Sequence, residues 1–138
     1  MPQGAIGPRV VRDLMRHRVV AGRRGERLSQ IAARMHQEDV GAIAIVETGR
    51  MIGIVTERDI VRAVGDGRDP RATTAGACMT AQPMTVRPGD SLASAAGIMT
   101  ALGVRHLPVV EDDRPIGFVS ARDLLVLQGW PYQAAARR

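Results

Sequence analysis

The sequence predicts a mixed α/β fold of the α+β type, in which two copies of one β-α-β-β-α unit pack with pseudo-twofold symmetry. Three observations lead to this prediction. The chain repeats itself at a constant offset of 64 residues without a gap. Apolar residues recur at helical spacing in both copies, and short apolar runs between turns indicate strands. One such unit exposes an apolar sheet face, so two must pack together to form a core.

Pairs of identical residues carry the repeat from end to end. They include Met15/Met79, Gly25/Gly89, Leu28/Leu92, Met35/Met99, Val46/Val110, Gly53/Gly117 and Asp59/Asp123. The expected segments are a leader (1–9), a first motif (10–65), a linker (66–74), a second motif (75–128) and a tail (129–138).

Local patterning assigns the elements of the first copy. The expected order is a short helix at 10–17, an extended piece at Val19-Val20, a helix at 26–37, and strands at 42–46 and 51–55. A last helix begins at Thr56, and its Ile60, Val61 and Val64 are expected to face inward.

The second copy repeats this order. We expect a short helix ending near Met79, an extended piece at 83–86, a helix at 91–102, strands at 105–110 and 115–119, and a helix at 120–128. The tail holds Trp130 and Tyr132, two of the three aromatic residues. They are expected either to dock on their own domain or to contact another subunit.

Composition limits the classes of function. No apolar run approaches the roughly 20 residues that span a bilayer, and the N-terminus lacks the pattern of a signal peptide. Cys78 is the only cysteine, so a reducing, cytoplasmic location is expected. The net charge is +5, but the arginines are scattered and aromatic residues make up 2% of the chain. Nucleic-acid binding is therefore the less favoured reading.

The same turn is written twice, at Gly53–Asp59 and Gly117–Asp123. In each copy an apolar strand runs into a hydroxyl residue, and an aspartate follows three positions later. This order predicts a capping box made by Thr56 with Asp59, and by Ser120 with Asp123. A helix start of this kind also offers N–H groups to an anion such as phosphate.

Catalytic and metal-binding patterns are missing from the sequence. His17, His36 and His106 have no ligand spacing with Cys78, and no Ser/His/Asp or Cys/His set stands out. We therefore expect neither an enzyme nor a metal site, and no required cofactor.

Four motifs together resemble a known family. They are Asp13-Leu14-Met15, Gly53–Asp59, Arg105–Val110 and Gly117–Asp123. In register and in tandem, over residues 9–128, they resemble the cystathionine-β-synthase (CBS) domain pair, or Bateman module. The resemblance implies two motifs whose sheets pack together, a homodimer, and a cleft that often holds an adenine nucleotide or S-adenosylmethionine. It also implies sensing or regulation rather than chemistry.

The resemblance further implies roles for individual residues. Asp59 and Asp123 would bind ribose hydroxyls, and Thr56 and Ser120 would help to hold phosphate. Adenine would lie against the short first strand of either copy, at Val19, Val20, Met84 and Val86. Arg105 and His106 either meet phosphate or make ordinary surface and interface hydrogen bonds.

The chain departs from the family pattern in two ways. No catalytic or transport domain accompanies the pair, so a regulated protein partner is expected to act in trans or to be absent. The first copy has Gly41-Ala42 where the second has Arg105-His106, and Glu38 and Asp39 precede that strand and would repel phosphate. We therefore expect unequal clefts. The rival hypotheses are a ligand-free interaction module and, less favoured, a nucleic-acid-binding protein.

Overall fold

A computed structural model describes residues 7–127. The expectation for Trp130 and Tyr132 falls outside this range. The helices are α1 (Leu28–Glu38), α2 (Glu57–Gly65), α3 (Ala75–Cys78), α4 (Leu92–Leu102) and α5 (Ala121–Leu127). The strands are β1 (Ala21–Gly22), β2 (Ala42–Glu47), β3 (Arg50–Thr56), β4 (Thr80–Ala81), β5 (His106–Glu111) and β6 (Arg114–Ser120).

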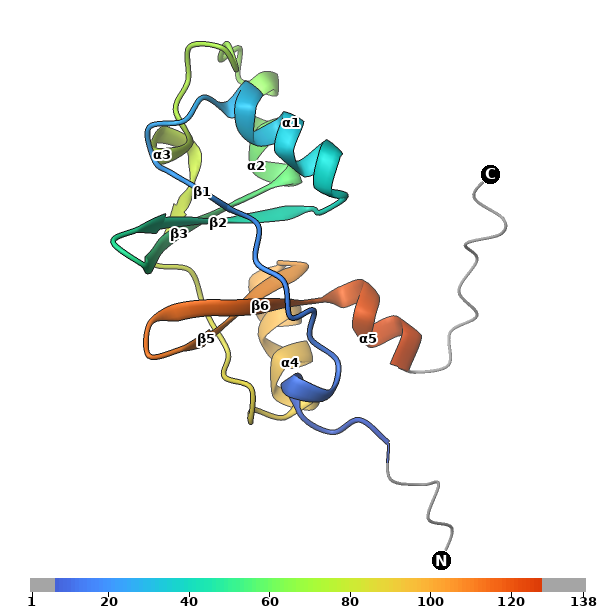
Figure 1. The fold of residues 1–138 in the computed structure, drawn as a ribbon. Coiled ribbons are helices and arrows are strands. Elements are labelled where there is room, and N and C mark those ends of the chain that lie inside the picture. Colours follow the sequence, from blue (N-terminus) through green and yellow to red (C-terminus); the bar gives the residue numbers. More distant parts are fainter. Residues whose placement is uncertain (1–6, 128–138) are drawn as a thin grey trace, which may run out of the picture.

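Two sheets form the centre of the molecule. One has the strand order β1-β2-β3-β4, and the other is the hairpin β5-β6. Figure 1 shows α1, α2 and α3 with the first sheet, and α4 and α5 with the second. Between the sheets lie Ala44, Ile54 and Phe118, each at most 9% exposed. The expected α+β fold with two packed motifs is confirmed.

The two hairpins are built alike. Ile43 pairs with Val55 in β2–β3, and the repeat equivalent Leu107 pairs with Val119 in β5–β6. A register shift follows Ile45 in one hairpin and its equivalent, Val109, in the other. The repeat therefore extends to backbone hydrogen bonding, as pseudo-twofold symmetry requires.

The short segment that precedes each motif in the sequence pairs with the other motif in the structure. Arg16 pairs with Phe118 of β6, and the equivalent Thr80 of β4 pairs with Ile54 of β3. Figure 1 shows the blue N-terminal segment beside α4 and β6 before it crosses to the first sheet. Because this segment also buries Val11 in the core of the second motif, the two motifs share their cores.

The first segment differs from the expected helix at 10–17. Only a 3-10 turn forms, at Val11–Asp13. The Asp13 carboxylate accepts the backbone N–H groups of Arg9 and Val10, and the chain then extends so that Arg16 can pair with β6. The turn ends where this pairing begins.

Helix α2 also presents a different face from the one expected. Val61 and Val64 are 71% and 52% exposed, whereas Asp59 and Ala63 are buried and Ile60 packs against the core. The capping aspartate takes an inward position, which rotates the two valines outward. The expectation that Val61 and Val64 face inward is wrong.

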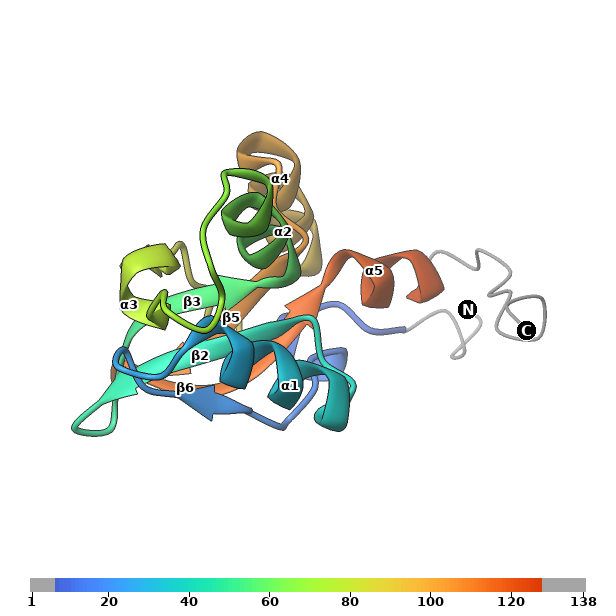
Figure 2. The same cartoon turned by 90° about the horizontal axis from the view of Figure 1, so that it is seen from above.

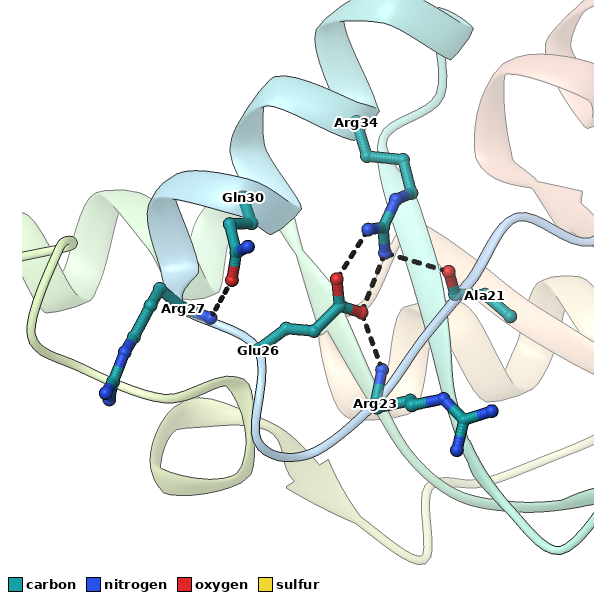
Figure 3. Close-up of polar contacts among 6 residues, drawn as sticks. All are labelled: Ala21, Arg23, Glu26, Arg27, Gln30 and Arg34. Carbon is teal, nitrogen blue, oxygen red and sulfur yellow. Dashed lines mark hydrogen bonds and ion pairs between the residues drawn. The ribbon is translucent and has the colours of Figure 1, made fainter.

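A polar cluster fixes α1 to the edge of β1 (Figure 3). The guanidinium of Arg34 binds both carboxylate oxygens of Glu26, at 2.9 and 2.5 Å, and donates to the carbonyl of Ala21 at 3.0 Å. Glu26 also accepts the N–H of Arg23 at 2.9 Å. These bonds hold the pKa of Glu26 below its usual value, with the Arg34 hydrogen bond the largest cause. In the second motif Ile98 stands at the position of Arg34 and Val86 at that of the neighbouring Gly22, whereas Glu26 corresponds to Asp90.

Among residues 7–127, no helix is both long and apolar enough to cross a membrane.

Candidate ligand-binding site

The two repeated turns are capping boxes in the structure. Asp59 Oδ2 accepts the backbone N–H of Thr56 at 2.8 Å, and the Thr56 hydroxyl accepts the N–H of Asp59 at 3.4 Å. In the second copy Asp123 Oδ2 accepts the N–H of Ser120 at 3.0 Å, and the Ser120 hydroxyl accepts the N–H of Asp123 at 3.2 Å. Both caps are confirmed, and each leaves Oδ1 of the aspartate outside the cap.

The remaining carboxylate oxygens face different arginines. Asp59 Oδ1 lies 3.6 Å from Nη1 of Arg62, one turn along the same helix. Asp123 Oδ1 lies 3.6 Å from Nε of Arg16, which comes from the crossing N-terminal segment. The two aspartate side chains are 9% and 13% exposed, so both are buried to a similar degree.

A large cavity opens beside Asp123. Its volume is about 1370 Å³, and its walls come from both motifs. Five of the residues proposed from the sequence line it: Val20, Arg105, His106, Ser120 and Asp123. Seen from above (Figure 2), α5 lies at one end of the sheets. Helices α1 and α2, which contact each other, supply residues to the wall of the first motif.

The wall from the first motif is mainly apolar. Val20, Met35, Val40, Ala42 and Ile60 line it. Such a wall can pack against a flat heterocycle, whereas the polar groups near Asp123 can hold hydroxyls or an anion.

Charged groups of both signs line the same cavity. Arg16, Arg18, Arg105 and Arg122 are the arginines, and Asp39, Glu57 and Asp123 are the carboxylates. The arginine charges exceed the carboxylate charges by one.

His106 lies at the contact between the motifs. A Cβ placed on Gly41 would meet His106 Nε2 at 3.1 Å and Glu57 Oε1 at 2.6 Å, so all three residues crowd one point. Burial lowers the pKa of His106 below its usual value. The charges of Glu57 and Asp123 oppose this effect, and the charge of Arg105 adds to it.

The cavity beside Asp59 is much smaller. Its volume is about 200 Å³, and it is lined by Arg62, Asp66, Arg68 and Cys78 besides Asp59. Arg68 Nη1 lies 3.4 Å from the Cys78 sulfur. Small-molecule sites usually measure about 300–1,000 Å³, so this cavity is below that range and the Asp123 cavity above it. The cavities beside the two aspartates therefore differ in volume.

Four proposed residues line neither cavity. Thr56 serves the cap of α2. Val19 packs between the sheets. Val86, 1% exposed, belongs to the core of the second motif, and Met84 is 53% exposed on the surface.

Sequence reasoning missed Arg16 and Arg18 at the larger cavity. Both lie before the first strand, in a part of the chain assigned by position to the first motif. Their place beside Asp123 follows from the pairing of Arg16 with β6, which local periodicity does not reveal. The alternation of Arg16 and Arg18 ahead of an extended piece is the one available signal.

No group of three or more His, Cys, Asp or Glu side chains in the described range is arranged to hold a metal ion.

Relatives of this chain include CBS domain proteins. The chain is 34% identical over 119 residues to the CBS domain-containing protein YhcV of Bacillus subtilis, which covers 86% of this chain and 84% of YhcV. Two other curated relatives are longer, and the chain spans 64% and 47% of their lengths.

Solved CBS pairs have the same fold. The CBS domain pair of protein MJ0100, in complex with 5-methylthioadenosine and S-adenosyl-L-methionine, matches 87% of this chain and 95% of its own with a TM-score of 0.81 and 23% identity. The CBS domain protein PAE2072 of Pyrobaculum aerophilum, complexed with AMP, matches 92% of this chain and 98% of its own with a TM-score of 0.80 and 25% identity. The family model for the CBS domain matches residues 11–66 and 75–128. The chain belongs to the CBS domain family and carries two CBS domains in tandem.

Proposed function

We propose that this CBS pair is a regulatory module that binds an adenosyl ligand in the larger cavity. The observation that carries the proposal is the meeting of Asp123, Ser120 and Val20 in one cavity with walls from both motifs. Asp123 Oδ1 would accept ribose hydroxyls, since the cap occupies only Oδ2. The apolar wall beside Val20 would pack against adenine. The adenosyl compounds bound by the MJ0100 and PAE2072 pairs support this class of ligand.

The ligand would act by shifting a population. Because it touches both motifs, it stabilises the mutual orientation in which both walls reach it. A protein partner that distinguishes the two orientations would then respond to the ligand. A cytoplasmic location suits this role and the free, half-buried Cys78.

Thermal unfolding against AMP, ADP, ATP, S-adenosylmethionine and NAD tests the proposal. A ligand at a hundred times its Kd adds about 2.7 kcal/mol of stability, which raises the Tm by several degrees. The rise should persist in Asp59→Ala and disappear in Asp123→Ala, although both variants lose a capping box worth about 1 kcal/mol. A flat response to every compound at millimolar concentration would reject the proposal and favour the ligand-free interaction module.

Exposed apolar side chains support a homodimer as the second part of the proposal. Val61 and its repeat equivalent Leu125 are 71% and 48% exposed, and Val64 and Val126 extend the apolar surface on α2 and α5. Since the two helices are equivalent in the repeat, a second copy offers each of them a matching apolar face. Sedimentation should show a dimer that Val64→Asp weakens and that Leu102→Asp, on α4, leaves intact. A monomeric wild type would contradict it.

A further inference from the structure

Four basic residues that line the larger cavity have uncharged residues at the equivalent positions of the other repeat. The pairs are Arg16/Thr80, Arg18/Gln82, Arg105/Gly41 and His106/Ala42. The pseudo-twofold scaffold therefore presents basic side chains beside Asp123 and none at the equivalent positions beside Asp59.

The three arginines have hydrogen-bond donors to spare. Arg16 faces Asp123 through Nε, so both of its Nη groups remain. Arg18 pairs with Glu38, and a guanidinium carries five donors. Within residues 7–127, the Arg105 guanidinium makes no hydrogen bond or ion pair, and its side chain lines the cavity. Forked guanidinium groups of this kind match phosphate oxygens.

Two of the three carboxylates that line the cavity come from the wall formed by the first motif. Asp39 ends α1 and Glu57 begins α2, both in the first motif. When Asp123 is engaged by ribose, the four arginines of the cavity face Asp39 and Glu57, and Glu38 pairs with Arg18. One positive charge remains in excess, so the cavity favours an anion over a neutral or cationic group. This preference is moderate, because the Arg16 and Arg18 side chains are 64% and 55% exposed and water screens them.

Near Asp59, a hydrogen bond joins the two motifs. Arg58 Nη1 donates to the carbonyl of Gly103 at 3.2 Å and so joins α2 to the residue that caps α4. The equivalents of these two residues, Arg122 and Asp39, line the large cavity instead. The cavity beside Asp59 measures only about 200 Å³. Its two arginines, Arg62 and Arg68, contact Asp59 and the Cys78 sulfur, so it offers a nucleotide little room.

We propose that each chain binds one phosphorylated adenosyl ligand, and that Arg16, Arg18 and Arg105 hold its phosphate beside Asp123. The inference rests on the proposed function and narrows it from any adenosyl compound to an anionic nucleotide, in a single site per chain. S-adenosylmethionine and unphosphorylated adenosine would bind this chain more weakly.

Calorimetric titration of the full chain with AMP, adenosine and S-adenosylmethionine tests this inference. We expect one AMP per chain, with an affinity at least tenfold above that of the other two compounds. The double variant Arg18→Gln/Arg105→Gln should weaken AMP at least tenfold and leave adenosine within twofold of wild type. Arg18→Gln copies Gln82, the residue at the equivalent position of the other repeat.

The matched control is Arg23→Gln/Arg87→Gln. It removes the same charge from two exposed residues that are equivalent in the repeat and line neither cavity, and it should keep wild-type AMP affinity. Adenosine or S-adenosylmethionine binding as tightly as AMP, two AMP molecules per chain, or equal losses in both double variants would overturn the inference and leave the proposed function standing. No binding of any of the three compounds would overturn both.

Discussion

At the scale of single residues, the same capping box occurs in two different surroundings. Asp59 and Asp123 make the same bonds to their caps, and the sequence alone predicts this because capping depends on neighbours three positions apart. The surroundings differ because Arg16 reaches Asp123 from more than a hundred positions away in the chain. Contacts of that range depend on tertiary pairing, so the cap was predictable and the place of Arg16 beside it was not.

His106 leads to a prediction about pH. In the unfolded chain its pKa has the ordinary value near 6.5, and burial lowers it in the folded protein. The unfolded state therefore binds more protons as the pH falls through 6.5, and the folded protein loses stability there. The loss is complete below the folded pKa. Urea unfolding from pH 7.5 to 5 should show a smaller loss in His106→Gln than in wild type.

The control for this prediction is His36→Gln. His36 lines the same cavity but is exposed, so its substitution removes an imidazole from the cavity without changing the buried contact between the motifs. Equal pH dependence in His106→Gln and wild type would show that His106 does not titrate differently on folding.

At the scale of elements, the helices and strands agree closely with the patterns that predicted them. Helix α1 and strands β2 and β3 lie within two residues of the ranges expected from apolar spacing. The helix expected at 10–17 forms only a 3-10 turn, and the other failures concern orientation and pairing. Val61 and Val64 satisfied a helical pattern, yet the buried cap of Asp59 determined which side of α2 faces the core. In short helices, one buried polar residue can outweigh two valines.

The Glu26–Arg34 cluster provides a prediction at this scale. A Cβ on Gly22 would lie 2.8 Å from Ile31 Cδ1 and 3.1 Å from Arg34 Nη1, so Gly22→Val should cost about 1–3 kcal/mol by overpacking. Arg34→Ile should also destabilise the protein, because Glu26 loses its partner. The double variant copies the Val86 and Ile98 of the second motif, and it should be less destabilised than the sum of the single variants by about 0.5 kcal/mol or more.

Urea unfolding of the two single variants and the double variant measures this coupling. Strictly additive losses of stability in the two single variants would mean that valine at 22 and isoleucine at 34 do not pack together as Val86 and Ile98 do in the second motif. The contribution of Glu26 should also fade as the pH drops, because its lowered pKa stabilises the fold above its usual value near 4.5 and not below the folded pKa.

At the scale of the whole molecule, the repeat predicts symmetry but not the exchange of segments. The offset of 64 residues establishes that two equivalent units pack together. It does not show that Val11 and Met15 complete the second core, or that Ala75 and Met79 pack in the first. Short segments of two or three strand residues carry too little pattern to choose between two equivalent partners.

Separated halves should therefore fail to fold. A fragment of residues 74–138 keeps α4, β5, β6 and α5, but it lacks Val11, which is fully buried in its core, and the backbone partner of Phe118. We expect no cooperative thermal transition by circular dichroism, and partial recovery on adding a peptide of residues 7–18. A fragment that unfolds cooperatively by itself would contradict a shared core. The full chain under the same conditions is the control.

The crossing N-terminal segment also affects how the protein is made. Arg16 leaves the ribosome about 100 residues before its partner Phe118, which is a delay on the order of 5–20 s at ordinary rates of synthesis. Until then Val11 and Met15 have no core to enter. The second core can therefore close only after Phe118 has been made, and the segment that carries Val11 and Met15 remains available to chaperones until that moment.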